Sequence, residues 1–167
     1  MGDHMAASPS ISALADSIAA AAHDGQLDKA GNPYIGHVRR VAGYVDPADQ
    51  HAVAAALLHD IVEDTAVTPA DLTAAGLPGE VVDAVVLLTR YDGLAPEDYY
   101  TQIRRHPLAR EVKLADLADN TDPSRLALLP PERQAKLTRK YAAAYQALGA
   151  DDTDGHRRRQ QHRGVPG

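Results

Sequence analysis

Residues 57–65 read Leu57-Leu58-His59-Asp60-Ile61-Val62-Glu63-Asp64-Thr65. This stretch ends an alanine-rich apolar segment, and several ionisable groups follow directly. Burying such groups costs free energy unless each one has a partner. On a helix, His59 and Glu63 lie four residues apart and share a face. Asp60 and Asp64 form a second stripe beside them. We therefore expect a helix that offers an imidazole and a carboxylate to a cation and, one turn later, an acid–base pair to a water molecule.

Helix start signals and apolar periodicity surround this stretch on both sides. Asp46-Pro47 and Thr68-Pro69 each combine an N-capping residue with proline at the first helical position. The period of the valine-rich run 80–89 would also suit a strand, but no second run is present to pair with it, so we predict a buried helix. The predicted helices cover residues 10–23, 34–44, 46 to about 62, 69–76, 80–89, 96–106, 107–120 and 131–148. The sequence thus predicts an all-α helical bundle.

The chain is long enough for one domain with a core and too short for two. Residues 1–9 open with Met-Gly-Asp-His-Met, which resembles an expression scar, and we leave this disordered stretch out of the fold. Residues 150–167 are rich in aspartate and arginine and show no apolar periodicity, which predicts a disordered, solvated tail. The single folded domain is therefore expected to span residues 10–149.

Composition excludes several classes of function. The net charge of −6 argues against a broad nucleic-acid surface, which needs a basic face. No apolar run approaches the roughly 20 residues that cross a bilayer, so no membrane partner is expected. The chain of 167 residues has no cysteine, which excludes disulfides and thiolate chemistry and fits a cytoplasmic protein.

Two further islands supply metal ligands of the same kind. His37 lies on the predicted second helix, and Asp116 is a buried-looking carboxylate on the apolar helix 107–120. With His59 and Asp60 they make a set of two imidazoles and two carboxylates, which suits Mn²⁺, Fe²⁺ or Zn²⁺ better than Ca²⁺.

Each of these residues also has an ordinary structural interpretation. A His-Asp pair on a helix is usually surface decoration or a cap, and His37 alone fits a partly buried, hydrogen-bonded histidine. Asp116 alone fits a cap or an ion pair with Lys113 on the previous turn. The order of the whole set along predicted helices favours the metal site.

That order resembles the HD superfamily of phosphohydrolases, and most closely the hydrolase domain of the RelA/SpoT family with its small stand-alone alarmone hydrolases. The resemblance covers about residues 11–148. It is carried by four segments, His23-Asp24-Gly25-Gln26, Gly31-Asn32-Pro33-Tyr34-Ile35-Gly36-His37, Leu57-Leu58-His59-Asp60 with Glu63-Asp64-Thr65, and Val112-Lys113-Leu114-Ala115-Asp116 with Asn120. The tandem Glu-Asp is more specific than the His-Asp pair, which many phosphohydrolases share.

The resemblance implies one Mn²⁺ ion, with Fe²⁺ or Zn²⁺ as alternatives, at His37, His59, Asp60 and Asp116. It implies that Glu63 and Asp64 activate the attacking water and that Lys29 and Asn120 contact a nucleotide substrate. The implied reaction removes the 3′-pyrophosphate from guanosine tetra- or pentaphosphate.

Departures from the family pattern leave other functions open. The family usually has an arginine where this chain has Asp28, a basic residue where it has Leu117, and a histidine or tyrosine where it has Asp119. A second reading is an HD phosphatase for another nucleotide, such as a nucleoside monophosphate or NADPH. A third reading is a non-catalytic nucleotide-binding HD module, in which the carboxylates of Glu63 and Asp64 would be needless.

Overall fold

The computed structural model describes residues 7–163, and its regular elements in that range are all helices. They are α1 (Ile11–Ala22), α2 (Ile35–Gly43), α3 (Gln50–Leu58), α4 (Ile61–Asp64), α5 (Pro69–Ala74), α6 (Gly79–Leu88), α7 (Pro96–Arg105), α8 (Pro107–Asn120), α9 (Pro123–Leu126), α10 (Pro131–Ala147) and α11 (Asp152–Arg163). The only extended pairing within residues 7–163 is an isolated bridge between Leu27 and Pro33. This confirms the predicted all-α fold. Residues 1–6 and 164–167, where part of the predicted disorder falls, lie outside the described residues.

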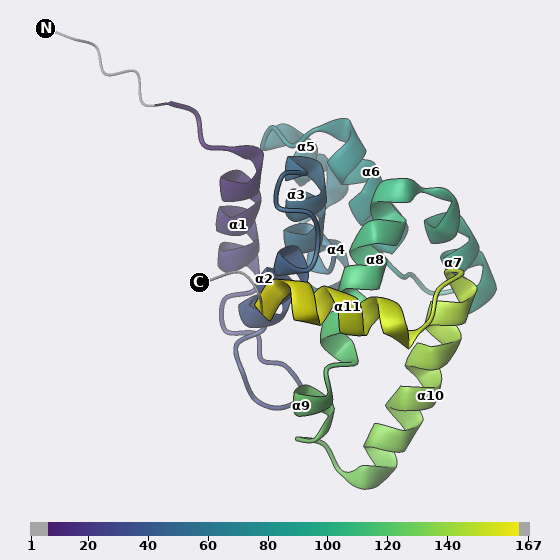
Figure 1. Cartoon of the computed structure of the whole chain (residues 1–167). Helices are drawn as coiled ribbons and strands as arrows, with labels where there is room; N and C mark the ends of the chain where they lie inside the picture. The colour runs from purple at the N-terminus through teal and green to yellow at the C-terminus, as the bar shows by residue number, and fades with distance from the viewer. Residues whose placement is uncertain (1–6, 164–167) are drawn as a thin grey trace, which may run out of the picture.

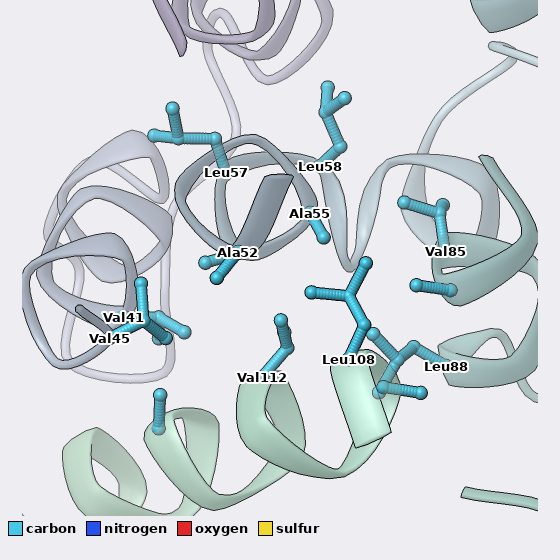
Figure 2. Packing of buried hydrophobic residues seen from close by; sticks show 14 of the residues in the cluster. Val41, Val45, Ala52, Ala55, Leu57, Leu58, Val85, Leu88, Leu108 and Val112 are labelled. Atoms are coloured by element: carbon cyan, nitrogen blue, oxygen red, sulfur yellow. The ribbon is translucent and has the colours of Figure 1, made fainter. Parts of the chain in front are cut away.

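Helix α3 lies at the centre of the molecule and contacts α1, α2, α6 and α8. Its sequence is apolar on every side, as a helix needs when neighbours surround it. The small side chains of Ala52 and Ala55 allow these neighbours to approach closely, and both residues are buried. Figure 2 looks along α3 and shows the core around it, formed by Val41, Val45, Val85, Leu88, Leu108 and Val112.

The valine-rich run is helical, as predicted. It forms α6, in which Val81, Val82 and Val85 are buried. The helix packs against α3 and α8. The prediction for residues 69–76 is also confirmed, because Thr68 and Asp71 form a reciprocal capping box at the start of α5.

The predicted helix from residue 46 to about 62 differs from the structure at both ends. Its N-cap is Asp49, whose carboxylate accepts the amide N–H of Ala52, while Asp46 organises the turn before it. Its C-terminal end is Leu58, because His59 Nδ1–H donates to the carbonyl oxygen of Ala56 at 2.6 Å. In a continuing helix, that carbonyl would instead accept the backbone N–H of Asp60, four residues later. The chain then restarts as α4, so His59 and Asp60 stand at a junction.

The prediction of a disordered tail is wrong for residues 152–163, which form α11. Figure 1 shows α11 crossing over α8 and ending beside α2. The guanidinium of Arg158 is buried and donates to both carboxylate oxygens of Glu111, to Asp154 and to the carbonyl of Tyr44. Arg159 donates to the carbonyl of Ala118. These charged groups replace the apolar stripe whose absence suggested disorder.

A glycine allows this close packing. Gly155 is buried in α11, and a Cβ atom there would collide with the hydroxyl of Tyr145 on α10. Glycine lowers intrinsic helix stability by about 1 kcal/mol relative to alanine. The contacts of α11 with the rest of the domain therefore stabilise it, rather than its own helix propensity. The folded unit extends at least to Arg163 instead of ending at Gly149.

The described residues contain no helix that is both long and apolar enough to span a bilayer.

Candidate active site

The four predicted metal ligands come from three places in the fold and meet at one point. His37 lies on α2, His59 and Asp60 lie between α3 and α4, and Asp116 lies on α8. The Nε2 atom of His59 is 3.0 Å from Asp60 Oδ2 and 3.3 Å from Asp116 Oδ1. The Nε2 atom of His37 is 3.1 Å from Asp116 Oδ1 and 3.7 Å from Asp60 Oδ2. The sequence prediction that these residues share one site agrees with their placement.

Hydrogen bonds fix the orientation of both imidazole rings. His59 donates its Nδ1–H to the carbonyl of Ala56. His37 donates its Nδ1–H to Asp119 Oδ2 at 2.7 Å. A neutral imidazole that donates from Nδ1 carries a lone pair on Nε2. When neutral, both rings therefore aim a lone pair at the point where the carboxylates converge.

This geometry fits a divalent cation. Adjacent ligands of an ion with bonds of about 2.1 Å lie about 3 Å apart in octahedral geometry. Three of the four distances above are close to that value. Among residues 7–163, the buried Nε2 atom of His59 has no hydrogen-bond partner, which is costly for an acceptor unless a ligand binds it. His37, His59 and Asp60 each offer an atom within 4.8 Å of the others, and Asp116 lies against both imidazoles.

Outer partners hold the two carboxylates. Asp60 Oδ2 accepts the hydroxyl of Tyr34. Asp116 Oδ2 accepts Lys113 Nζ at 2.9 Å, and its Oδ1 accepts Asn120 Nδ2 at 3.1 Å. Through Oδ2, Asp116 thus forms the ion pair with Lys113 that its ordinary structural interpretation predicts. Its Oδ1 faces both imidazoles. Such partners restrict the ligands to one orientation.

Burial and neighbouring charges shift the pKa values of these groups. Burial alone would raise the pKa of Asp116, but the ammonium of Lys113 and the imidazole of His59 outweigh it and hold that pKa well below its usual range. Burial would lower the pKa of Lys113, and Asp116 reverses this and raises it. Burial and the charge of Asp60 both raise the pKa of Tyr34, which keeps its hydroxyl a donor.

The sequence analysis missed the role of Asp119. Its side chain is fully buried and accepts hydrogen bonds from His37, Arg40 and Arg125. Arg125 also lies 3.6 Å from Asp28, so two of the departures from the family pattern belong to one network. A carboxylate three residues after a proposed ligand, directly following the apolar Leu117 and Ala118, was the signal available in the sequence.

A cavity of about 650 Å³ opens beside the ligands. His37, Asp60 and Asp116 line it together with the predicted catalytic carboxylates Glu63 and Asp64. The predicted substrate contacts Lys29 and Asn120 line it as well.

Each of the two catalytic candidates is held by one donor. Glu63 Oε1 accepts the backbone N–H of Arg90 at 2.6 Å. Asp64 Oδ2 accepts Gln26 Nε2 at 3.2 Å. One oxygen of each carboxylate has this partner, and the other remains available to the cavity. The arrangement offers a cation site and proton acceptors within one hollow.

The chain is similar in sequence to known proteins. The chain is 35% identical over 128 residues to a probable GTP pyrophosphokinase of Mycobacterium leprae, covering 71% of this chain and 16% of that protein. It is 34% identical over 152 residues to a guanosine-3′,5′-bis(diphosphate) 3′-pyrophosphohydrolase of Vibrio cholerae, covering 84% of this chain and 22% of that protein. The chain thus spans about a fifth of the length of these relatives.

The fold also matches a solved structure. A metazoan ortholog of SpoT that hydrolyses ppGpp superposes with a TM-score of 0.73 at 23% identity, covering 95% of this chain and 98% of that one. This likeness concerns the fold. A family model described as HD domain matches residues 15–152. The chain therefore belongs to the HD domain family.

Proposed function

We propose that this protein removes the 3′-pyrophosphate from guanosine tetra- or pentaphosphate, with one Mn²⁺ ion held by His37, His59, Asp60 and Asp116. The observation that carries the proposal is the convergence of two imidazoles and two carboxylates beside a cavity that Glu63 and Asp64 also line. Relatives such as that of Vibrio cholerae are named for this reaction.

The donor set supports Mn²⁺ as the ion, with Fe²⁺ or Zn²⁺ as alternatives, because two nitrogen and two oxygen ligands suit these metals better than Ca²⁺. When bound, such a cation lowers the pKa of a coordinated water and neutralises charge on phosphoryl oxygens.

Glu63 and Asp64 are the proposed groups that orient the attacking water and take its proton. Both carboxylates line the cavity and are exposed to solvent, so a water molecule can reach them. General bases in such positions contribute about 10²–10⁴-fold to rate. Their anchoring to Arg90 and Gln26 leaves each with one oxygen for this task.

The charges around the cavity support a polyanionic substrate. Six cationic side chains line it, which are Lys29, Arg40, Arg90, Lys113, Arg125 and Lys140. Within residues 7–163, Arg40, Lys113 and Arg125 form ion pairs, while no ion pair involves Lys29, Arg90 or Lys140. Burial, Arg90 and Lys29 together lower the pKa of Lys140. A phosphate chain would relieve this repulsion.

Asn120 and Lys29 remain proposed substrate contacts. Asn120 donates one amide hydrogen to Asp116, and its remaining amide atoms are available to a sugar hydroxyl or a phosphate. Lys29 is exposed on the loop between α1 and α2 and lines the cavity.

A second candidate function is hydrolysis of another nucleotide, a nucleoside monophosphate or the 2′-phosphate of NADPH. Asp28 favours it, because this carboxylate lines the cavity where the resemblance leads one to expect an arginine. Its oxygens accept the backbone N–H groups of Ala30 and Asn32 and face Arg125, so Asp28 stabilises its own loop.

One assay separates these functions. The purified protein with Mn²⁺ would be offered guanosine polyphosphates, nucleoside monophosphates and NADPH, and released pyrophosphate and orthophosphate would be measured separately. Pyrophosphate from guanosine tetraphosphate is the expected result. Orthophosphate from another nucleotide would support the second function, and nucleotide binding without turnover would support the non-catalytic module.

A further inference from the structure

A chain of two hydrogen bonds leads from a buried histidine to Asp64. His23 Nδ1 lies 2.7 Å from Gln26 Oε1, and Gln26 Nε2 lies 3.2 Å from Asp64 Oδ2. His23 is at the C-terminal end of α1, and Asp64 is the last residue of α4. Gln26 therefore connects two segments that are 38 residues apart in the sequence.

The chemistry of the three groups fixes the direction of both bonds. A carboxylate only accepts hydrogen bonds, so Gln26 must present its NH₂ group to Asp64. Its Oε1 atom then faces His23, which must donate from Nδ1. His23 is consequently the Nδ1–H tautomer or is protonated on both nitrogens.

His23 is an unusual choice for this position if it has no further role. The residue is only 2% exposed, and its Nε2 atom has no hydrogen-bond partner within the described residues. A buried polar atom without a partner costs free energy, which an apolar side chain of similar size would avoid. Within residues 7–163, the one hydrogen bond of its side chain is with Gln26.

The loop between α1 and α2 also contacts Asp60, one of the proposed metal ligands. Tyr34 at its end donates to Asp60, and the rings of His23 and Tyr34 lie 5.1 Å apart. One loop thus contacts both the carboxylate that would bind the cation and the carboxylate that would take the proton. The side chain of Asp64 is exposed and would otherwise be free to rotate on a helix of a single turn.

We infer that Gln26, held by His23, is a positioning residue that fixes the carboxylate of Asp64 for proton transfer. The inference rests on the proposed function. With Oδ2 held by the amide, Oδ1 points to the water instead of sampling other rotamers. The bond of Gln26 to Tyr34 runs through the backbone carbonyl, which a substitution keeps, and its side chain bonds to His23 and Asp64. Loss of that side chain therefore affects turnover and leaves the cation in place.

The experiment compares Gln26→Ala and Gln26→Glu with a matched control. Gln50 also links distant segments through one side-chain bond, from Ser12 Oγ at 2.8 Å, so Gln50→Ala serves as the control. In Gln26→Ala we expect kcat for guanosine tetraphosphate to fall about 10–100-fold, part of the contribution of a general base. We expect KM and Mn²⁺ affinity to stay within about twofold of the parent. Gln26→Glu should lose at least as much, because two carboxylates repel.

¹⁵N NMR of the His23 imidazole shows which ring nitrogen carries the proton, independently of activity. The parent should show Nδ1 protonated, and Gln26→Ala should lose that preference, whereas Gln50→Ala should retain it. Unchanged kcat in Gln26→Ala, or a loss of Mn²⁺ affinity equal to the loss of kcat, would overturn the inference. If the parent cleaves no nucleotide, the proposed function fails, and a His23 ring protonated only on Nε2 would overturn the positioning contact independently.

Discussion

Asp119 accepts the Nδ1–H of His37 at 2.7 Å and is itself held by the guanidinium groups of Arg40 and Arg125. The carboxylate therefore does more than fill a buried position, because it sets which nitrogen of a proposed metal ligand carries the lone pair. Burial would raise the pKa of Asp119, but its bonds to His37 and Arg40 outweigh this and lower it, so the carboxylate stays charged.

We predict that Asp119→Asn weakens Mn²⁺ binding by about 10–100-fold, the usual loss when the partner of a metal-binding histidine is changed. The amide keeps the shape of the side chain and removes its charge. Isothermal titration with Mn²⁺ measures the effect. Asp16→Asn is the control, because Asp16 forms an exposed ion pair with Arg39 on the surface. Equal affinities in the two variants would contradict the role of Asp119.

Substitutions of Asp60 and Glu63 should separate binding from chemistry. Asp60→Ala should lose metal and activity together, since it removes one of the four ligands. Glu63→Ala should keep the metal and lose about 10²–10⁴-fold in kcat, as expected for a general base. Metal analysis of the purified variants and steady-state kinetics test both statements. Metal retained in Asp60→Ala would refute the ligand assignment.

Stability should depend on pH differently with and without the cation. Burial opposes protonation of His59, but Asp60 and Asp116 outweigh it and raise its pKa well above the usual value, and the pKa of His37 is also raised. A raised pKa stabilises the metal-free fold fully below about pH 6.5, and this stabilisation is lost as pH rises through the folded-state value. Bound metal instead requires neutral imidazoles.

The Tm of the chelated protein should therefore fall as pH rises above about 6.5, and the gain in Tm on adding Mn²⁺ should grow over the same interval. Calorimetry in chelator and in excess Mn²⁺, from mildly acidic to alkaline pH, measures the gap in Tm between the metal-free and the metal-bound protein. A gap that stays constant with pH would show that protons and metal do not compete for these rings.

Arg158 should contribute strongly to stability, although it lies in the C-terminal segment. Arg158→Ala removes buried hydrogen bonds to Tyr44 and Glu111, and because Glu111 is partly exposed we expect a loss of about 2 kcal/mol in the free energy of unfolding. Arg157 pairs with Asp154 and is exposed, so Arg157→Ala should change the free energy of unfolding by less than about 0.5 kcal/mol. Urea denaturation compares the two, and a loss in Arg158→Ala as small as that in Arg157→Ala would contradict the structural role of Arg158.

Local sequence patterns predicted most of the helices, because their signals are local. Proline after a capping residue marked α5, and apolar periodicity marked α1, α2 and α10. That the four proposed ligands lie together was also predictable, since Asp116 is flanked by apolar residues and His59 and Asp60 directly follow the apolar run of α3. The Glu-Asp pair, the cavity and the ligands then lie together as expected.

Other features depend on contacts between distant residues. The break after Leu58 requires an imidazole that bonds to its own helix, which helix propensity does not encode. The order in α11 requires Glu111 and the carbonyl of Tyr44, far away in sequence, as partners for Arg158. The role of Asp119 requires arginines from α2 and α9. In the sequence alone, these features are visible only as a polar tail and a substituted position.

The way α11 ends has a practical consequence for reporter fusions. His162 lies over the ring of Tyr44, and a Cβ atom on Gly43 would collide with its imidazole, so this end of the chain sits tightly against α2. A fluorescent protein joined directly after Arg163 would press on the helix that carries His37. Residues 7–10 precede α1 and are exposed, so cargo attached there would not press on α2.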